Sequence, residues 1–215
     1  MLVVGLTGDV GAGKSTVARF WRNQGAFLID SDEVVRSLWA TEQLRDEALR
    51  RFGKKAIPPE GGSLDLSVIA EAVFSNEEDY RWVCGLIHPL ALDKISEMLK
   101  GKTGWIVVEL PLLFEAGRPP WIDLVVFVSA KAENRIEWTK QRGWANGEIS
   151  RREKWLLPSS LKEAQSDIVL KNNGSLESFL EKVERMGRIM KELSMEERRP
   201  VSPREWKRRL KEAIA

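Results

Sequence analysis

Nine residues near the start of the chain combine three glycines with a lysine and two hydroxyl side chains, in the order Gly8-Asp9-Val10-Gly11-Ala12-Gly13-Lys14-Ser15-Thr16. They fit the pattern Gly-x-x-x-x-Gly-Lys-[Ser/Thr], in which backbone N–H groups surround the phosphates of a nucleotide. The lysine of this pattern reaches the β- and γ-phosphates, and the hydroxyl after it binds Mg²⁺. We therefore expect Lys14 to contact phosphate and Ser15 to contact the metal. The glycines permit the tight turn and the close approach of the backbone.

The segments on either side are of the type that such a loop requires. The apolar run 2–7 predicts a buried strand, and the amphipathic run after the loop predicts a helix that begins at Ser15. The first turn of a helix has unpaired N–H groups and lies at the positive end of the helix dipole. The sequence therefore predicts an anion site where strand, loop and helix meet.

Two carboxylates follow the second apolar run, 26–29, in the triplet Asp30-Ser31-Asp32. A carboxylate at the end of a neighbouring strand can accept the proton of a hydroxyl that attacks the γ-phosphate, because phosphoryl transfer depends mainly on positioning and charge stabilisation. Asp30 has an alternative role as the cap of the following helix, since aspartate is common at helix starts. The residues alone leave the choice of base between Asp30 and Asp32 open.

Other polar residues lie where they could handle phosphate or metal. Glu109 ends the apolar run 105–108, at a position suited to an acidic residue near Mg²⁺ and its waters. Arg135 and Arg142 are about two helical turns apart, so one helix face can present both guanidinium groups to a migrating phosphoryl group. Most arginines on a charged helix are simply solvated. His88, the only histidine, precedes a proline and could equally be structural.

The elements that must position these residues alternate between strand and helix. Strands are predicted at the apolar runs 2–7, 26–29, 105–108, 124–128 and, more weakly, 168–170. This alternation is typical of an α/β fold with a doubly wound, parallel, five-stranded sheet, whose ligands bind beyond the carboxyl ends of the strands. The long interval after Asp32 predicts helices instead, at 33–39, 42–52, 65–74 and 77–99, with a loop at 58–62 and a capping box at 75–78.

The pattern suggests a core with insertions. The nucleotide-binding core would comprise residues 1–31, 103–130 and 158–193. Residues 32–102 would form a helical lobe for the acceptor, and residues 131–157 would form a lid. Residues 194–215 form a basic C-terminal extension in which 202–205 resembles a helix start with proline in the first turn. Trp206, Leu210 and Ile214 then share one helix face, which favours docking of this helix on the core over a partner site.

Composition indicates an ordinary globular protein. The 215 residues carry a formal net charge of +2, so no global basic field argues for nucleic acid or a membrane surface. The single cysteine excludes an internal disulfide and suits the cytoplasm, where we expect the protein to work. The sequence contains no run of about 18 apolar residues, the length that a helix needs to cross a bilayer. The sequence leaves the oligomeric state open.

Several motifs occur together in the order and spacing of one enzyme family. They are the glycine-rich loop, the Asp30–Asp32 triplet after 25–29, Ile87-His88-Pro89, Pro111-Leu112-Leu113-Phe114-Glu115 and the run SDIVLKNNGS at 166–175. Over roughly residues 1–185 the chain resembles the dephospho-CoA kinases, the last enzymes of coenzyme A synthesis. The resemblance implies a sheet of the P-loop kinase type and ATP-dependent phosphorylation of the ribose 3′-hydroxyl of dephospho-CoA, with Mg²⁺ as cofactor. ATP and dephospho-CoA are the expected partners.

The resemblance also implies roles for single residues. Asp32 matches the second Asp of the family's Asp-Ala-Asp and is the expected base, and Arg142 matches the lid arginine; with Lys14 they form the expected catalytic set. Ser15 and Glu109 are the expected metal contacts. ATP is expected to contact Gly8, Gly11, Ala12, Gly13, Lys14, Ser15 and Thr16, with Asn172 near the adenine. The acceptor is expected to border His88, Pro111, Leu112, Leu113, Phe114 and Glu115.

The sequence departs from the family pattern in three places. Leu156 stands where the lid segment usually has Gln, and Glu109 stands where Asp is common. The tail beyond about residue 193 has no counterpart in the pattern. These departures concern the lid, the metal contact and the tail, while the phosphate loop and Asp32 keep to the pattern.

Three alternative functions compete with this interpretation. The first is another small-molecule kinase of the same fold, acting on a nucleoside or nucleotide, and the motifs around His88 and the turn 111–115 favour dephospho-CoA over it. The second is a GTP-binding switch, which normally carries Asn-Lys-x-Asp and Asp-x-x-Gly, and neither occurs here. The third is a nucleotide-binding module without activity, which the presence of Lys14, Ser15 and Asp32 disfavours.

Overall fold

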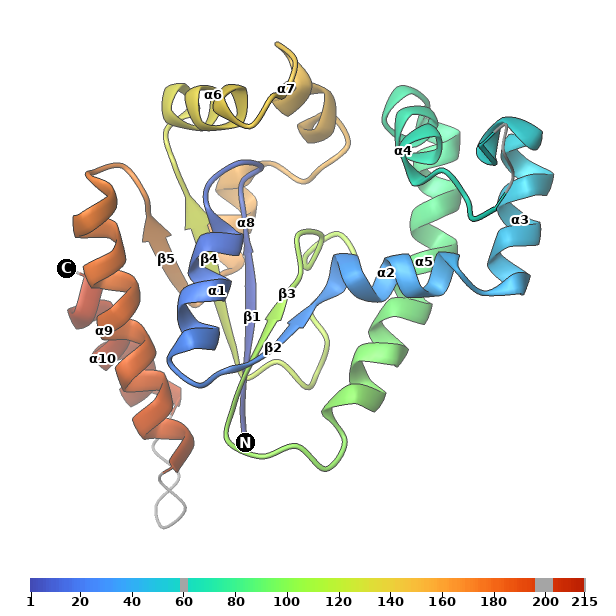
Figure 1. The fold of residues 1–215 in the computed structure, drawn as a ribbon. Coiled ribbons are helices and arrows are strands. Elements are labelled where there is room, and N and C mark those ends of the chain that lie inside the picture. Colours follow the sequence, from blue (N-terminus) through green and yellow to red (C-terminus); the bar gives the residue numbers. More distant parts are fainter. Residues whose placement is uncertain (59–61, 196–202, 215) are drawn as a thin grey trace. The chain divides into compact units, whose positions relative to one another are not determined.

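The computed structural model describes residues 1–58, 62–195 and 203–214 (Figure 1). The chain divides into two compact units. The first unit comprises Met1–Asp30 and Lys100–Ala215, and the second comprises Ser31–Leu99. The sheet and the glycine-rich loop belong to the first unit, and the long run of helices between the second and third strands forms the second.

A parallel sheet forms the centre of the first unit (Figure 1). Its strand order is β2-β3-β1-β4-β5, and the strands are β1 (Leu2–Gly8), β2 (Phe27–Asp30), β3 (Trp105–Glu109), β4 (Leu124–Ser129) and β5 (Ile168–Lys171). Strands β1, β3 and β4 are buried along their whole length, which explains why they read as continuous apolar runs. The predicted α/β fold with a five-stranded parallel sheet is confirmed, and each predicted strand overlaps an observed one.

The register of the sheet brings the carboxyl ends of three strands together. Asp30 at the end of β2 pairs with Glu109 at the end of β3, and Glu109 in turn pairs with Leu6 near the end of β1. The loop that follows β1 therefore begins beside two acidic strand ends. This edge is where a doubly wound sheet binds its ligands.

Helices of the first unit cover one face of the sheet and its carboxyl end (Figure 1). Helices α1 (Lys14–Asn23) and α9 (Leu176–Met195) pack on the sheet through a core that contains Trp21 and Met186, both fully buried. Helices α6 (Ala132–Gln141) and α7 (Glu148–Glu153) lie beyond the carboxyl ends of the strands, and α8 (Ser159–Gln165) leads back into β5.

The C-terminal extension ends in a helix of the same unit, α10 (Pro203–Ile214). Leu210 is fully buried in the core beneath α9, and Trp206 and Ile214 pack against the same core. The predicted docking of this helix face is therefore confirmed, as is the proline at its first position. Ser202, which was also expected at the helix start, lies outside the described residues.

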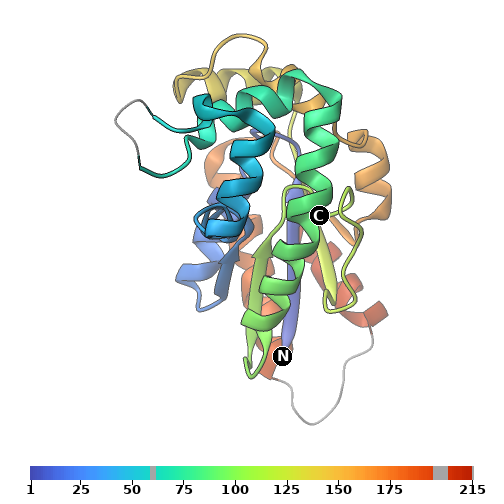
Figure 2. The ribbon, with the colours of Figure 1, turned by 90° about the vertical axis from the view of Figure 1, so that its right-hand side faces the viewer.

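The second unit is helical throughout its described part. It contains α2 (Ser31–Trp39), α3 (Glu42–Phe52), the short 3-10 helix η1 (Lys54–Ala56), α4 (Leu66–Ser75) and α5 (Glu77–Leu99). Figure 2 shows α5, in green, as the long helix of this unit, and α2 and α4 both contact it. The core of the unit gathers buried residues from each helix, among them Trp39, Phe52 and Ile87. The predicted loop at 58–62 lies mostly outside the described residues.

One predicted detail of the second unit was wrong. The side chain of Asn76 caps α5, because its Oδ1 accepts hydrogen bonds from the N–H groups of Glu78 and Asp79. Ser75, the predicted cap, belongs to the end of α4 and donates its hydroxyl to the carbonyl of Glu71. A serine and an asparagine side by side both suit a helix start, so the pattern placed the cap one residue early.

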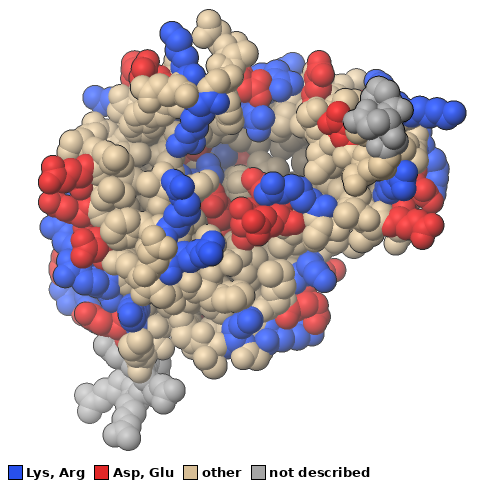
Figure 3. All heavy atoms as spheres, in the orientation of Figure 1, with Lys and Arg blue, Asp and Glu red and all other residues tan. Residues whose placement is uncertain are grey.

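The described surface carries charged side chains of both signs (Figure 3). On the face shown in Figure 3, basic and acidic side chains of the described residues are interspersed, as the near balance of 34 basic and 32 acidic residues leads one to expect. Within the described ranges, every helix is too short or too polar to traverse a bilayer.

Candidate active site

The glycine-rich loop takes the conformation that its glycines allow. Gly11 has a φ of 78° and Gly13, the residue before α1, has a φ of 103°, in the left-handed region that other residues avoid. A Cβ on Gly11 would lie 2.8 Å from Thr139 Cγ2 of α6. The Nζ of Lys14 donates hydrogen bonds across the loop to the carbonyls of Gly8 at 3.2 Å and Asp9 at 2.9 Å. The lysine thus lies over the loop, where the phosphates of a nucleotide would bind.

Ser15 and Glu109 meet beside the loop. The hydroxyl of Ser15 donates a 3.0 Å hydrogen bond to Glu109 Oε1, although the residues are 94 positions apart in the chain. Glu109 is buried at the end of β3, and Ser15 lies in the first turn of α1. The strand thus places a carboxylate against the hydroxyl that the loop motif assigns to the metal.

Oxygen ligands of this kind fit Mg²⁺. The ion prefers hard oxygen donors and usually takes one or two from the protein, while waters and substrate phosphates complete its shell. Ser15 Oγ and Glu109 Oε1 supply two such donors at the loop. Among the described residues, no group of three or more His, Cys, Asp and Glu side chains could hold a metal ion.

Two side chains from other elements hold the backbone of the loop. Asn172 Nδ2, just after β5, donates to the carbonyl of Ala12 at 3.0 Å, and Arg135 of α6 donates to the carbonyl of Val10 at 3.0 Å. Asn172 is itself buried, and its own N–H bonds to Ser129 at the end of β4. These contacts hold the carbonyls of Ala12 and Val10 and thereby restrain the backbone of the loop. The predicted place of Asn172 near the adenine stays a prediction.

The turn 111–115 follows β3 in the same unit. Leu113 is buried in the core, close to Gly5 and Ile122, while Pro111, Leu112 and Phe114 are partly exposed. Glu115 Oε1 accepts hydrogen bonds from the backbone of Leu157 and from Lys162. The contacts of Glu115 therefore lie with the segment between α7 and α8 and with α8 itself. The expected border with an acceptor stays a prediction for the whole turn.

Two predicted residues belong to the second unit. Asp32 is exposed in the first turn of α2, two residues after the end of β2, and Arg36 donates to its backbone carbonyl. His88 is half-buried in α5, which continues without interruption through Pro89. The roles of Asp32 as base and of His88 beside the acceptor remain predictions.

The predicted lid arginine, Arg142, is exposed at the end of α6. In contrast, Arg135 is largely buried on the same helix and joins Val10 of the loop to Glu153 at the end of α7. Of the two arginines that share the predicted helix face, Arg135 is thus the one in contact with the phosphate loop. Seven-residue spacing alone could not distinguish them.

Arg151 and Arg152 lie on α7. Both form ion pairs with Glu148, and both are about one third exposed. The hydrogen bond from Arg151 lowers the pKa of Glu148 to about 2, and Arg152 adds to this effect against the opposing effect of burial. The three side chains hold α7 together over one turn.

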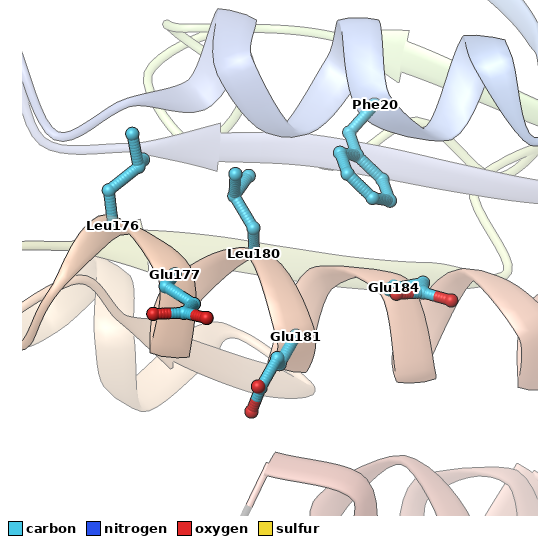
Figure 4. Close-up of a pocket in the computed structure, with 6 residues that line it drawn as sticks. All are labelled: Phe20, Leu176, Glu177, Leu180, Glu181 and Glu184. Carbon is cyan, nitrogen blue, oxygen red and sulfur yellow. The ribbon is translucent and has the colours of Figure 1, made fainter.

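A groove elsewhere in the first unit contains none of the predicted site residues. It lies between α1 and α9 (Figure 4), where Phe20 points toward α9 and Leu176 and Leu180 point toward α1. Glu177 and Glu181 of α9 point away from the apolar side chains. The groove is therefore an open apolar surface separate from the phosphate loop.

Sequence reasoning missed two residues that tie the site together. Arg135 was considered only as a partner of Arg142, and Lys162 was not considered. Lys162 is 3% exposed, and its Nζ lies 3.0 Å from Glu115 Oε1. A buried lysine has no local signal, since its burial depends on a carboxylate 47 positions away.

Comparisons with known proteins agree on one family. A model of the dephospho-CoA kinase family matches residues 2–178. The dephospho-CoA kinase of Deinococcus radiodurans is 37% identical over 183 residues, which are 82% of this chain and 86% of that protein. A solved structure from Thermus thermophilus is 31% identical with a TM-score of 0.69 and covers 85% of this chain and 94% of its own.

The fold is shared with a solved dephospho-CoA kinase from Campylobacter jejuni, which has a TM-score of 0.64 at 20% identity over 88% of this chain and 97% of that one. The family model spans the phosphate loop, the turn 111–115 and Asn172, and ends just inside α9. Helix α10 lies beyond the match. By these matches, the chain belongs to the dephospho-CoA kinase family.

Proposed function

We propose that this protein transfers the γ-phosphoryl group of ATP to the ribose 3′-hydroxyl of dephospho-CoA and releases CoA and ADP. Family membership supports the reaction, and the contact between Ser15 and Glu109 beside the phosphate loop is the observation that carries it to this chain. The proposal covers the substrates, the metal and the roles below.

The first unit supplies nucleotide binding. The N–H groups of the loop and the start of α1 bind the phosphate oxygens, and Lys14 leaves its carbonyl partners to meet the β- and γ-phosphates. Ser15 and Glu109 would hold Mg²⁺, which would supply neutralisation of the negative charge that moves during transfer. Arg135 and Arg142 lie on the lid helix, where guanidinium groups add to this neutralisation.

The second unit supplies the base and the acceptor contact of His88, and the turn 111–115 of the first unit supplies the other acceptor contacts. Asp32 accepts the proton of the 3′-hydroxyl and orients its oxygen toward the γ-phosphorus. Its place in the chain supports this role, because β2 ends at Asp30 and Asp30 pairs with Glu109 in the sheet. His88 and the turn 111–115 are assigned to the acceptor.

The test is a comparison of acceptors with purified protein, ATP and Mg²⁺, followed by ADP formation. Dephospho-CoA should give the highest kcat/KM, and adenosine, AMP and other nucleosides should give little ADP above the rate without acceptor. ADP formation that a nucleoside stimulates and dephospho-CoA does not would assign the chain to the nucleoside kinases instead. Omission of Mg²⁺ should abolish the dephospho-CoA signal.

A further inference from the structure

One buried carboxylate joins the turn after β3 to the chain that returns from the lid. Glu115 Oε1 accepts a hydrogen bond from the N–H of Leu157 and one from the Nζ of Lys162, each 3.0 Å long. Leu157 lies between α7 and α8, and Lys162 lies on α8. The side chains of Lys162 and Glu115 are 3% and 9% exposed. Two distant segments of the first unit thus meet at a single oxygen atom.

A buried ion pair such as Glu115 and Lys162 adds little to the free energy of unfolding. Removal of two charges from water costs about as much as their attraction returns, and apolar residues of similar size often serve equally well. The pair here is also incompletely satisfied, because Glu115 Oε2 is buried and has no hydrogen-bond partner among the described residues. Its directional contacts instead fix the position of the returning chain, through a backbone N–H and a side chain together.

The other end of the lid is attached to the phosphate loop. Arg135 donates to the carbonyl of Val10 and to Glu153, the last residue of α7. Glu153 precedes Leu157 by only four residues. A short stretch of chain therefore connects the attachment at the phosphate loop with the attachment at the turn 111–115.

We propose that Glu115 and Lys162 are positioning residues for phosphoryl transfer, which hold the return of the lid, 154–158, against the turn 111–115. With this anchor in place, α6 and α7 carry their arginines to the nucleotide in one defined arrangement. Without it the lid closes in several arrangements, and few of them bring the guanidinium groups to the phosphates. The inference rests on the proposed kinase function for its kinetic consequence, while the attachment itself is a property of the first unit.

The decisive variant is the double change Glu115→Gln with Lys162→Met. The single change Lys162→Met leaves a buried carboxylate without its cation, so it lowers stability whatever its role. The double variant removes both charges together, and the amide oxygen of glutamine can still accept from Leu157. We expect its melting temperature to recover most of the loss, but its kcat/KM with ATP and dephospho-CoA to stay about tenfold or more below wild type.

A second readout follows the lid without catalysis. Arg142 and Gly143 are exposed at the end of α6, so trypsin can cut between them, and mass spectrometry identifies the product. A non-hydrolysable ATP analogue should protect this bond in the wild-type protein and protect it much less in the double variant. Lys207→Met is the matched control, because it also breaks an ion pair to a buried carboxylate, Asp167, far along the chain from the lid. It should keep wild-type kinetics and protection.

The possible results separate the two proposals. Loss of protection and of kcat/KM in a double variant of recovered stability supports the positioning role. A double variant that regains wild-type kinetics together with stability, or a wild-type lid that the analogue does not protect, overturns it. Wild-type protein that is inactive with dephospho-CoA refutes the proposed function alone, since the protection experiment needs no acceptor.

Discussion

The hydroxyl of Ser15 and the carboxylate of Glu109 are joined by a 3.0 Å hydrogen bond between the first turn of α1 and the end of β3. One residue belongs to the phosphate-loop motif and the other to a strand whose sequence only hinted at a metal contact. In the proposed metal site, their proximity would give the loop a second oxygen donor for Mg²⁺.

Glu109→Gln should therefore weaken the binding of Mg²⁺ more than the binding of nucleotide. Loss of the negative charge should raise the Mg²⁺ concentration that gives half-maximal rate by about tenfold or more, as for other changes around metal ligands. A titration of the rate with Mg²⁺ at saturating ATP measures the shift. Glu177→Gln, on the outer side of the groove at α9, is the matched control and should leave the titration curve unchanged.

Lys14→Ala should impair both ATP binding and turnover. The ammonium group is expected to exchange its hydrogen bonds to Gly8 and Asp9 for the phosphates, so its removal should lower kcat by about 10²-fold or more. Calorimetric ATP binding and steady-state kinetics test the two effects. Lys211→Ala, an exposed lysine on α10, should behave as wild type. Unchanged binding and turnover in Lys14→Ala together would contradict the role of the loop.

Asp32→Asn should affect chemistry and spare ATP binding. Loss of the base should lower kcat by about 10²- to 10⁴-fold, with the dissociation constant of ATP nearly unchanged, because the contact matters in the transition state. Glu33→Gln removes a neighbouring exposed carboxylate from the same helical turn and should have little effect. If Asp30→Asn were instead the inactive variant, the assignment of the base would move to Asp30.

Leu210→Ala should lower the free energy of unfolding, although α10 lies beyond the part of the chain that the family model matches. Leu210 is fully buried in the core beneath α9, so the cavity should cost about 2–5 kcal/mol. Leu176→Ala, at a side chain that is 64% exposed, should change stability by less than about 0.5 kcal/mol. Chemical denaturation measures both. Equal effects in the two variants would show that α10 does not share the core in solution.

Acid should weaken the attachment of α10. Burial alone raises the pKa of Asp167, but the hydrogen bonds from Lys207 and Val125 and the charge of Arg118 outweigh it, so the pKa lies below its ordinary value of 3.8. A carboxyl with a lowered pKa in the folded state contributes stability above its unfolded pKa, and that contribution is lost as the pH falls through the folded pKa. The free energy of unfolding should thus decrease below about pH 4.

Asp167→Asn serves as the comparison for this pH dependence. It removes the titrating group, so the difference in stability between wild type and variant should shrink as the pH falls from 6 toward 3. A difference that stays constant or grows over this range would show that the ion pair to Lys207 does not contribute in the way described.

The sheet was predictable because its three central strands are buried on both faces. The runs that became β1, β3 and β4 contain hardly any polar residue and are rich in valine, which leaves few alternatives to a central parallel strand. The helical second unit was equally visible from the helical patterns and the lack of strand signals between Asp32 and Leu99. The glycine-rich loop was predictable because its pattern gives a physical role to the glycines, the lysine and the hydroxyl residue.

Some details escaped prediction because neighbouring residues suit the same role, and others because they depend on contacts far apart in the sequence. Asn76 rather than Ser75 caps α5, a choice between adjacent residues of nearly equal preference. Of the pair Arg135 and Arg142, it is Arg135 that contacts the phosphate loop, because only the fold decides which turn of α6 faces Val10. The catalytic role expected of Arg142 stays a prediction. The residues that flank Lys162 in the sequence do not indicate that it is buried against Glu115.

The most direct test follows the γ-phosphoryl group itself. ATP labelled at the γ-phosphate is incubated with dephospho-CoA and Mg²⁺, and the product is separated and its phosphate position determined by NMR spectroscopy. The account predicts labelled CoA with the phosphate on the ribose 3′-oxygen, in amounts equal to the ADP formed, and its near absence with Asp32→Asn. Label that appears only as inorganic phosphate, or on another hydroxyl, would contradict it.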